Sequence, residues 1–227
     1  MSGNFGELAR RRRMTRHFMP DPVDDVLLAR VLDAARRVPS AGNSQGFDFV
    51  VLSGASQTAR YWDATLPADR RDSFRWASLV ACPVLITVWA DPGAYVERYA
   101  ESDKAHTGLG EGSDAWSTPF WTVDASFAAM ALQYAAIDEG LGVLFFGMFE
   151  HAEAVAAALG VPPSHEPVGV VAVGWPDRSA EASSGPAASQ DRPRRPLFAE
   201  ANEPDPEALN ATVDRPLVHR GHWLGHW

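Results

Sequence analysis

The stretch Pro39-Ser40-Ala41-Gly42-Asn43-Ser44-Gln45-Gly46-Phe47-Asp48-Phe49 joins an expected helix to an expected strand. Before it, apolar residues from Leu28 to Ala35 recur at the i, i+3, i+4, i+7 spacing of one helix face. After it, residues 47–52 are a short apolar run typical of a strand. Residues 39–45 carry many polar side chains, and a glycine lets a flat ligand approach the backbone. A plain connecting turn explains the same composition, so the local pattern leaves both interpretations open.

Upstream of this stretch, five of the seven residues from Arg10 to Arg16 are arginines, although the formal net charge of the chain is -9. Guanidinium groups present a planar set of donors that matches phosphate oxygens. A solvated helix face is the alternative, because blocks of like charge usually lie on the surface. A capping box at Asn4 predicts a helix that runs to about Arg16. A second basic cluster follows a Ser- and Pro-rich connector, residues 176–190, and two such clusters can converge on one small anion.

The rest of the chain alternates between expected helices and strands. Apolar, β-branched runs predict strands at residues 83–90, 143–149 and 168–175. A helical hairpin is expected over residues 55–78, a long loop over 106–119, and helices over 120–139 and 151–159. Residues 120–139 are apolar on every side, which predicts a buried central helix or a subunit-interface helix. The lone Cys82 lies in an apolar run and is interpreted as a core residue.

Length and composition indicate one globular domain, with 227 residues, 46% hydrophobic and 22% charged. We assign residues 1–200 to this domain and residues 201–227 to a C-terminal tail that wraps the body or a partner subunit. No apolar run is long enough for a membrane span and no secretory signal is recognisable, so a cytoplasmic location is expected. The acidic balance argues against nucleic acid as a partner. His219, His222 and His226 lack the spacing of zinc motifs, so no metal site is expected.

Several motifs, taken together and in order, resemble the FMN-dependent nitroreductase family. They are Arg12-Arg13-Met14-Thr15-Arg16-His17-Phe18, the stretch from Pro39 to Phe49, Gly140-Leu141-Gly142, Phe146-Gly147-Met148-Phe149 and Gly174-Trp175-Pro176. The family's usual pattern is Arg-Arg-Ser-x-Arg-x-Phe followed by Pro-Ser-x-x-Asn-x-Gln-Pro-Trp-x-Phe. The chain departs from it at Met14, which replaces a small hydroxyl residue, and at Gly46-Phe47, which replaces Pro-Trp.

The resemblance implies an α+β fold with a mainly antiparallel central sheet flanked by helices. It also implies an intertwined homodimer with FMN at the interface. The implied cofactor-binding residues are Arg12, Arg13, Arg16, Pro39, Ser40, Asn43, Gln45, Gly147, Met148, Arg192 and Arg194. The turn residues among them would contact the flavin of the partner subunit. A variable substrate wall would include Trp116, Phe120 and Trp121, whose alternative role is core or interface packing. No side chain is assigned as a general acid or base.

The function implied is that of an oxidoreductase in which NAD(P)H reduces bound FMN. A planar, electron-poor acceptor such as a nitroaromatic or quinone is then reduced in a ping-pong cycle. One alternative is a specialised flavin-dependent dehydrogenase, oxidase or flavin-fragmenting enzyme of a biosynthetic pathway. Another is a non-catalytic module that uses the arginines to bind an anion or nucleic acid.

Overall fold

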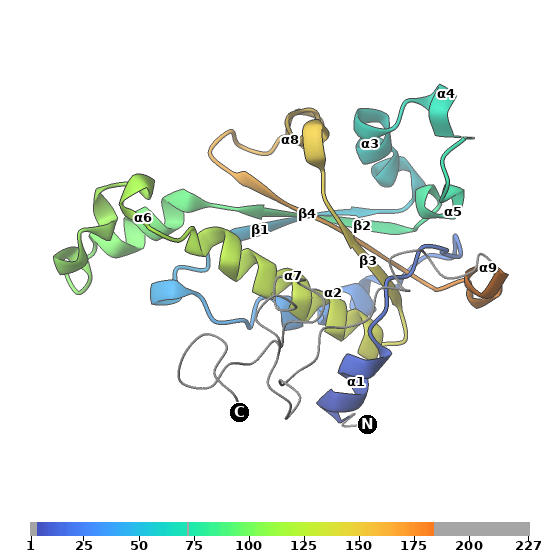
Figure 1. The fold of residues 1–227 in the computed structure, drawn as a ribbon, viewed down its shortest axis with the longest axis horizontal. Coiled ribbons are helices and arrows are strands. Elements are labelled where there is room, and N and C mark those ends of the chain that lie inside the picture. The colour runs from blue at the N-terminus through green and yellow to red at the C-terminus, as the bar shows by residue number, and fades with distance from the viewer. Residues whose placement is uncertain (1–3, 72, 184–227) are drawn as a thin grey trace, which may run out of the picture. The chain divides into compact units, whose positions relative to one another are not determined.

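A four-stranded antiparallel sheet with the strand order β1-β2-β4-β3 forms the centre of the fold (Figure 1). The computed structural model describes residues 4–71 and 73–183. Within it the strands are β1 (Phe47–Ser53), β2 (Val84–Ala90), β3 (Gly142–Phe146) and β4 (Glu166–Gly174). Every neighbouring pair is antiparallel. The predicted α+β fold with a mainly antiparallel sheet is therefore confirmed.

Helices cover both faces of this sheet. One face carries α1 (Phe5–Arg11), α2 (Asp25–Ala35) and α7 (Phe120–Asp138). The other carries α3 (Ala55–Thr65) and α8 (Ala152–Leu159). The remaining helices are α4 (Ala68–Arg71), α5 (Ala77–Val80), α6 (Pro92–Ala100) and α9 (Arg178–Ser183). In the part of the chain that the structure describes, no helix is long and apolar enough to cross a bilayer.

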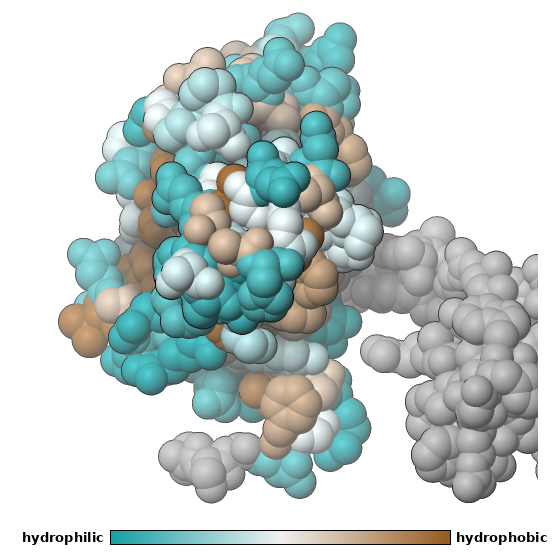
Figure 2. Space-filling view, turned by 90° about the vertical axis from the view of Figure 1, so that its left-hand side faces the viewer, coloured by the Kyte–Doolittle hydropathy of each residue, from teal (hydrophilic) through white to brown (hydrophobic). Residues whose placement is uncertain are grey.

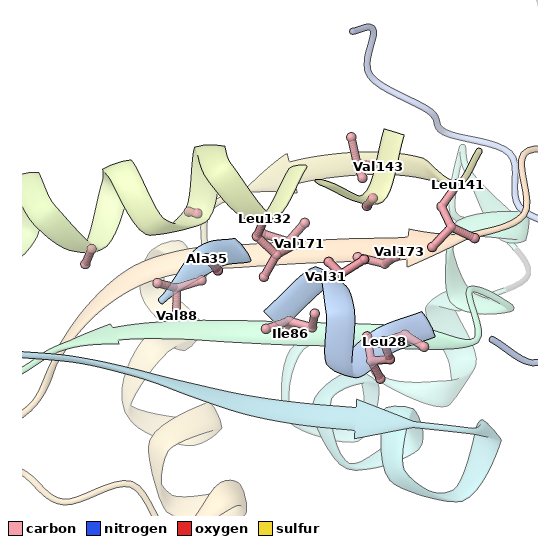
Figure 3. Packing of buried hydrophobic residues seen from close by; sticks show 14 of the residues in the cluster. Leu28, Val31, Ala35, Ile86, Val88, Leu132, Leu141, Val143, Val171 and Val173 are labelled. Atoms are coloured by element: carbon pink, nitrogen blue, oxygen red, sulfur yellow. The ribbon is translucent and has the colours of Figure 1, made fainter. Parts of the chain in front are cut away.

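Two hydrophobic clusters, one on each face, follow from the alternation of side chains along the strands. In β2, Ile86 and Val88 point toward α2 and α7, whereas Leu85 and Trp89 point toward α3 and α8. Figure 3 shows the first cluster, in which Val31 and Leu132 lie against the sheet. Cys82 belongs to the second cluster, and burial raises the pKa of its thiol to about 12. Its predicted role as a core residue is confirmed.

The segment that carries the arginines departs from the sequence-based expectation. The prediction of a helix through Arg16 is wrong, because α1 ends at Arg11 and the backbone of Arg12 is extended. Residues 12–19, here called the arm, run along the edge of the sheet. Thr15 N–H donates to the Val143 carbonyl at 2.8 Å, and Met19 N–H donates to the Trp175 carbonyl at 2.8 Å. Pairing with the sheet therefore outweighs the helical tendency of the arginine run.

Other differences from the expected elements are local. The three separate helices α3, α4 and α5 replace the hairpin expected over residues 55–78, and β3 ends at Phe146 instead of residue 149. Three short 3-10 turns occupy most of the expected loop 106–119. The helix α6 was not predicted, although Asp91 caps it by accepting from Gly93 N–H at 2.9 Å. The tail (201–227), Arg192, Arg194 and the three histidines near the C-terminus lie outside the described residues.

Candidate functional site

Four arginines line one pocket, here called the arginine pocket, with a volume of about 300 Å³. They are Arg10, Arg11, Arg13 and Arg178. Among the described residues none of them has a carboxylate partner, and Arg11 Nη2 donates to the Ile137 carbonyl at 3.1 Å. Arg10 and Arg11 therefore share this pocket with Arg13. Guanidinium groups concentrated in this way can bind a dianion such as a phosphate.

A second pocket, here called the aromatic pocket, has a volume of about 400 Å³. It brings together three residues that were predicted to bind FMN: Arg16, Gly147 and Met148. Its aromatic lining consists of Tyr61, Trp62, Phe74, Trp76, Phe145, Phe146 and Phe149. The Arg16 guanidinium lies 5.7 Å from the Trp76 ring centroid. A largely aromatic wall with one cation suits a flat, conjugated ring system.

The two pockets flank the arm and share its hydrogen-bonded neighbour β3. Arg13 and Thr15 line the arginine pocket, whereas Arg16 lines the aromatic pocket. In β3, residues 142–143 line the first pocket and residues 144–146 the second. Arg12 lines neither of them. The structure thus brings two of the three predicted arm arginines to neighbouring pockets.

The turn (residues 39–45) lies at the other end of the sheet from the arm. It precedes Phe47, which pairs with Ala90, whereas the arm meets β3 near Gly142, which pairs with Gly174 (Figure 1). Within the turn, Ser40 Oγ accepts from Gln45 N–H at 2.9 Å. A single chain therefore does not place Pro39, Ser40, Asn43 or Gln45 beside Arg16 or Gly147.

The three aromatic residues predicted to line a substrate wall lie near the turn. Trp116 packs against the Tyr99 ring at 4.7 Å between centroids and donates through Nε1 to the Leu109 carbonyl. Trp121 is buried and donates through Nε1 to Glu166 Oε2 at 2.8 Å. Phe120 is 40% exposed. Seen from this end, the surface is mainly hydrophilic with smaller apolar patches (Figure 2). Of the three rings, that of Phe120 is the most available to a ligand.

Two residues that depart from the family pattern, Gly46 and Met14, have a structural explanation. A Cβ atom at Gly46 would lie 2.5 Å from Tyr95 Cε2 and 2.7 Å from the Asp91 carbonyl oxygen, so this backbone leaves no room for proline. Met14 is half-buried and packs against the hydrophobic cluster on the α3 face of the sheet. Its side chain contributes to the core instead of offering a hydroxyl group.

We expect Gly46→Ala to lower the free energy of unfolding by about 1–3 kcal/mol, because the added methyl group must displace a buried ring or a backbone carbonyl. Urea denaturation followed by circular dichroism measures this change. Gly112→Ala is the matched control, since a Cβ atom there meets nothing within 4 Å. Equal stability of the two variants would contradict the close packing at Gly46.

Sequence reasoning did not find three residues that contact the turn or its neighbours: Tyr95, Arg98 and Asp124. Asp124 gives the clearest signal, because it is the only charged residue between positions 120 and 137 of an apolar helix. A buried carboxylate needs hydrogen-bond donors. A single acidic residue within an apolar helix therefore predicts that the fold places hydrogen-bond donors beside its side chain.

The chain thus forms a three-layered α+β domain, in which an antiparallel sheet lies between two layers of helices and an arginine-rich pocket lies at the edge of the sheet. The chain belongs to the nitroreductase family, whose model matches residues 9–175. The predicted family membership is confirmed.

The relatives agree with this assignment. The chain is 30% identical over 178 residues to a 5,6-dimethylbenzimidazole synthase of Rhodospirillum rubrum, covering 73% of this chain and 78% of the relative. It is 29% identical to an NADH dehydrogenase of Thermus thermophilus, covering 74% and 84%. A nitroreductase structure in complex with FMN, from Exiguobacterium sibiricum, superposes with a TM-score of 0.63 at 19% identity, covering 79% and 91%. Family and relatives together support an oxidoreductase.

Proposed function

We propose that the protein is an FMN-dependent oxidoreductase that uses NAD(P)H to reduce planar, electron-poor acceptors such as nitroaromatics or quinones. The observation that carries this proposal is the aromatic pocket, where Arg16, Gly147 and Met148 meet a largely aromatic wall. The adjacent arginine pocket provides the charge that a phosphate requires. The FMN complex of a family structure and the NADH dehydrogenase relative support the choice of cofactor and donor.

The residues present fit FMN at the level of their chemistry. Arg13 and its neighbours in the arginine pocket would hold the phosphate, together with Arg12 and the predicted Arg192 and Arg194. Arg16 and the backbone near Gly147 and Met148 would lie against the ring system, and the aromatic wall would exclude water. When bound, FMN supplies the hydride chemistry, so the side chains mainly orient the reactants and fix local dipoles.

The same proposal includes a homodimer, for two structural reasons. The turn and the arm lie at opposite ends of the sheet, so a flavin touched by both needs a second copy of the chain. In addition, the Phe127 and Met130 side chains of the central helix α7 are exposed, at 49% and 42%. Apolar side chains exposed in a row on a central helix suit a subunit interface.

Phe127→Glu is expected to convert a dimer to a monomer, because a charge at an apolar interface must lose its water. Sedimentation velocity measures the change in mass. Val26→Glu is the matched control, since Val26 is even more exposed but lies on α2. If the Phe127 variant dimerised with an unchanged dissociation constant, the subunit interface would lie elsewhere.

The test of function is spectroscopic. The purified protein should show the yellow absorbance of bound FMN, should be bleached by NADH or NADPH without oxygen, and should regain its colour when a nitroarene or quinone is added. A colourless protein that takes up no FMN would overturn the proposal. If it also bound DNA with a steep salt dependence, the arginines would serve a nucleic-acid-binding module instead.

A second candidate is a flavin-fragmenting or oxidase role in a biosynthetic pathway, favoured by the 5,6-dimethylbenzimidazole synthase relative. Oxygen separates the two candidates. A reductase completes its cycle anaerobically, whereas the second role needs oxygen and leaves a new organic product. The FMN-loaded protein is reduced, exposed to air and analysed by chromatography, with authentic 5,6-dimethylbenzimidazole as the standard. A new organic product supports the second role, and its absence supports the reductase.

A further inference from the structure

The turn (residues 39–45) has an unusual backbone that the surrounding structure must hold. Gly42, Asn43 and Gln45 all have positive φ angles, of 62°, 57° and 53°. Non-glycine residues rarely adopt this region, and they keep it only where neighbouring contacts enforce it. Gln45 Nε2 donates to Asn43 Oδ1 at 3.2 Å within the turn. A bond of this kind moves with the turn and does not fix it to the body of the protein.

A buried carboxylate fixes one side of the turn. Asp124, on α7, is only 3% exposed. Its Oδ2 atom accepts from the Ala41 backbone N–H at 2.8 Å and from the Tyr95 hydroxyl at 2.8 Å. Burial, followed by the hydrogen bond to Asp124, raises the pKa of Tyr95, so the hydroxyl stays a donor. A buried charge of this kind is tolerated only while its donors stay in place, which ties Ala41 to the centre of the fold.

A cation holds the other side of the turn. Arg98 Nε, on α6, donates to the Gly42 carbonyl at 2.8 Å. The Nη1 and Nη2 atoms of the same guanidinium donate to the two carboxylate oxygens of Asp103, at 2.8 and 2.9 Å. The Tyr99 ring closes this side, because a Cβ atom at Gly42 would lie 2.7 Å from its Cε2 atom. The turn is thus held at two consecutive residues, by Asp124 at the Ala41 N–H and by Arg98 at the Gly42 carbonyl.

We propose that Asp124 and Arg98 are positioning residues that keep the turn ready to receive the flavin. This inference rests on the proposed function, in which the turn contacts the flavin of the partner subunit. In this role both residues act on the turn and not on the cofactor itself. By fixing the Ala41 N–H and the Gly42 carbonyl, they remove the cost of ordering the turn when FMN binds.

The test compares Asp124→Leu, Asp124→Asn and the control Leu132→Ala. Leu132 is fully buried on the same helix, about two turns beyond Asp124, and its side chain has no hydrogen-bonding group. Asp124→Leu should weaken FMN binding by 10-fold or more and shift the visible circular dichroism of the bound flavin. Asp124→Asn retains a side-chain oxygen acceptor and should restore most of the affinity. Leu132→Ala should lower the melting temperature and leave affinity and spectrum unchanged.

Hydrogen exchange of the flavin-free protein provides a readout that does not depend on FMN. Peptides covering residues 39–46 should exchange faster in Asp124→Leu and in Arg98→Gln than in the wild type. The Arg98 side chain is partly exposed, at 24%, so Arg98→Gln provides a second test of the positioning role if Asp124→Leu fails to fold. A wild-type protein that takes up no FMN would overturn the proposed function alone. Unchanged exchange in the turn, or equal loss of FMN in Leu132→Ala and Asp124→Leu, would overturn the positioning role.

Discussion

Arg13→Ala combined with Arg178→Ala is expected to lower the affinity for FMN by about two to four powers of ten. Each guanidinium lost from a charged hydrogen bond costs about 1.5–3 kcal/mol, and about 1.4 kcal/mol corresponds to a factor of ten. Both side chains line the arginine pocket and have no carboxylate partner in the described part of the chain. Their removal should therefore leave folding intact, because it breaks no ion pair.

Flavin fluorescence titration of the unliganded protein measures this affinity directly. Arg70→Ala is the control, because Arg70 is an exposed arginine on α4 that lines none of the pockets described. A single Arg16→Ala change should weaken binding by about one to two powers of ten on the same scale, and it should also alter the flavin spectrum. Full retention of FMN by the double variant would remove the phosphate role of the arginine pocket.

The sequence predicted the fold where a single pattern determined the element. The expected helix over residues 120–139 is α7, which ends at Asp138, and the continuous apolar run of β2 allows both faces of that strand to be buried. The arm was mispredicted because local signals, a capping box and helix-forming arginines, extend beyond the point where the chain pairs with β3. That pairing joins residues 128 or more positions apart, such as Thr15 and Val143. No pattern in the local sequence predicts it.

The candidate site was predictable in part. The family resemblance grouped Arg16 with Gly147 and Met148 as implied flavin contacts, and all three line one pocket. The same reasoning left out Arg178, which reaches the arginine pocket from the far end of the described chain. It also gave no account of the left-handed backbone at Asn43 and Gln45, because that conformation depends on contacts from two helices.

The arm is held against β3 by a close contact that can be tested with Gly142→Val. A Cβ atom at this buried position would lie 2.7 Å from Thr15 Oγ1, 2.8 Å from Cγ2 and 3.0 Å from Cβ. The arm cannot retreat without losing the hydrogen bond from Thr15 N–H to the Val143 carbonyl. We therefore expect the free energy of unfolding to fall by at least about 3 kcal/mol, measured by urea denaturation.

The same change should weaken FMN binding, because Arg13 and Arg16 are carried by the displaced arm. Thr15→Ala is the matched partner variant, since it removes the two nearest atoms but keeps the backbone bond. In a double-mutant cycle, Thr15→Ala should recover part of the stability lost in Gly142→Val, with a coupling energy of about 0.5–3 kcal/mol. Strict additivity of the two changes would show that the arm is not held at this contact. The arrangement of the arm arginines would then depend on other parts of the fold.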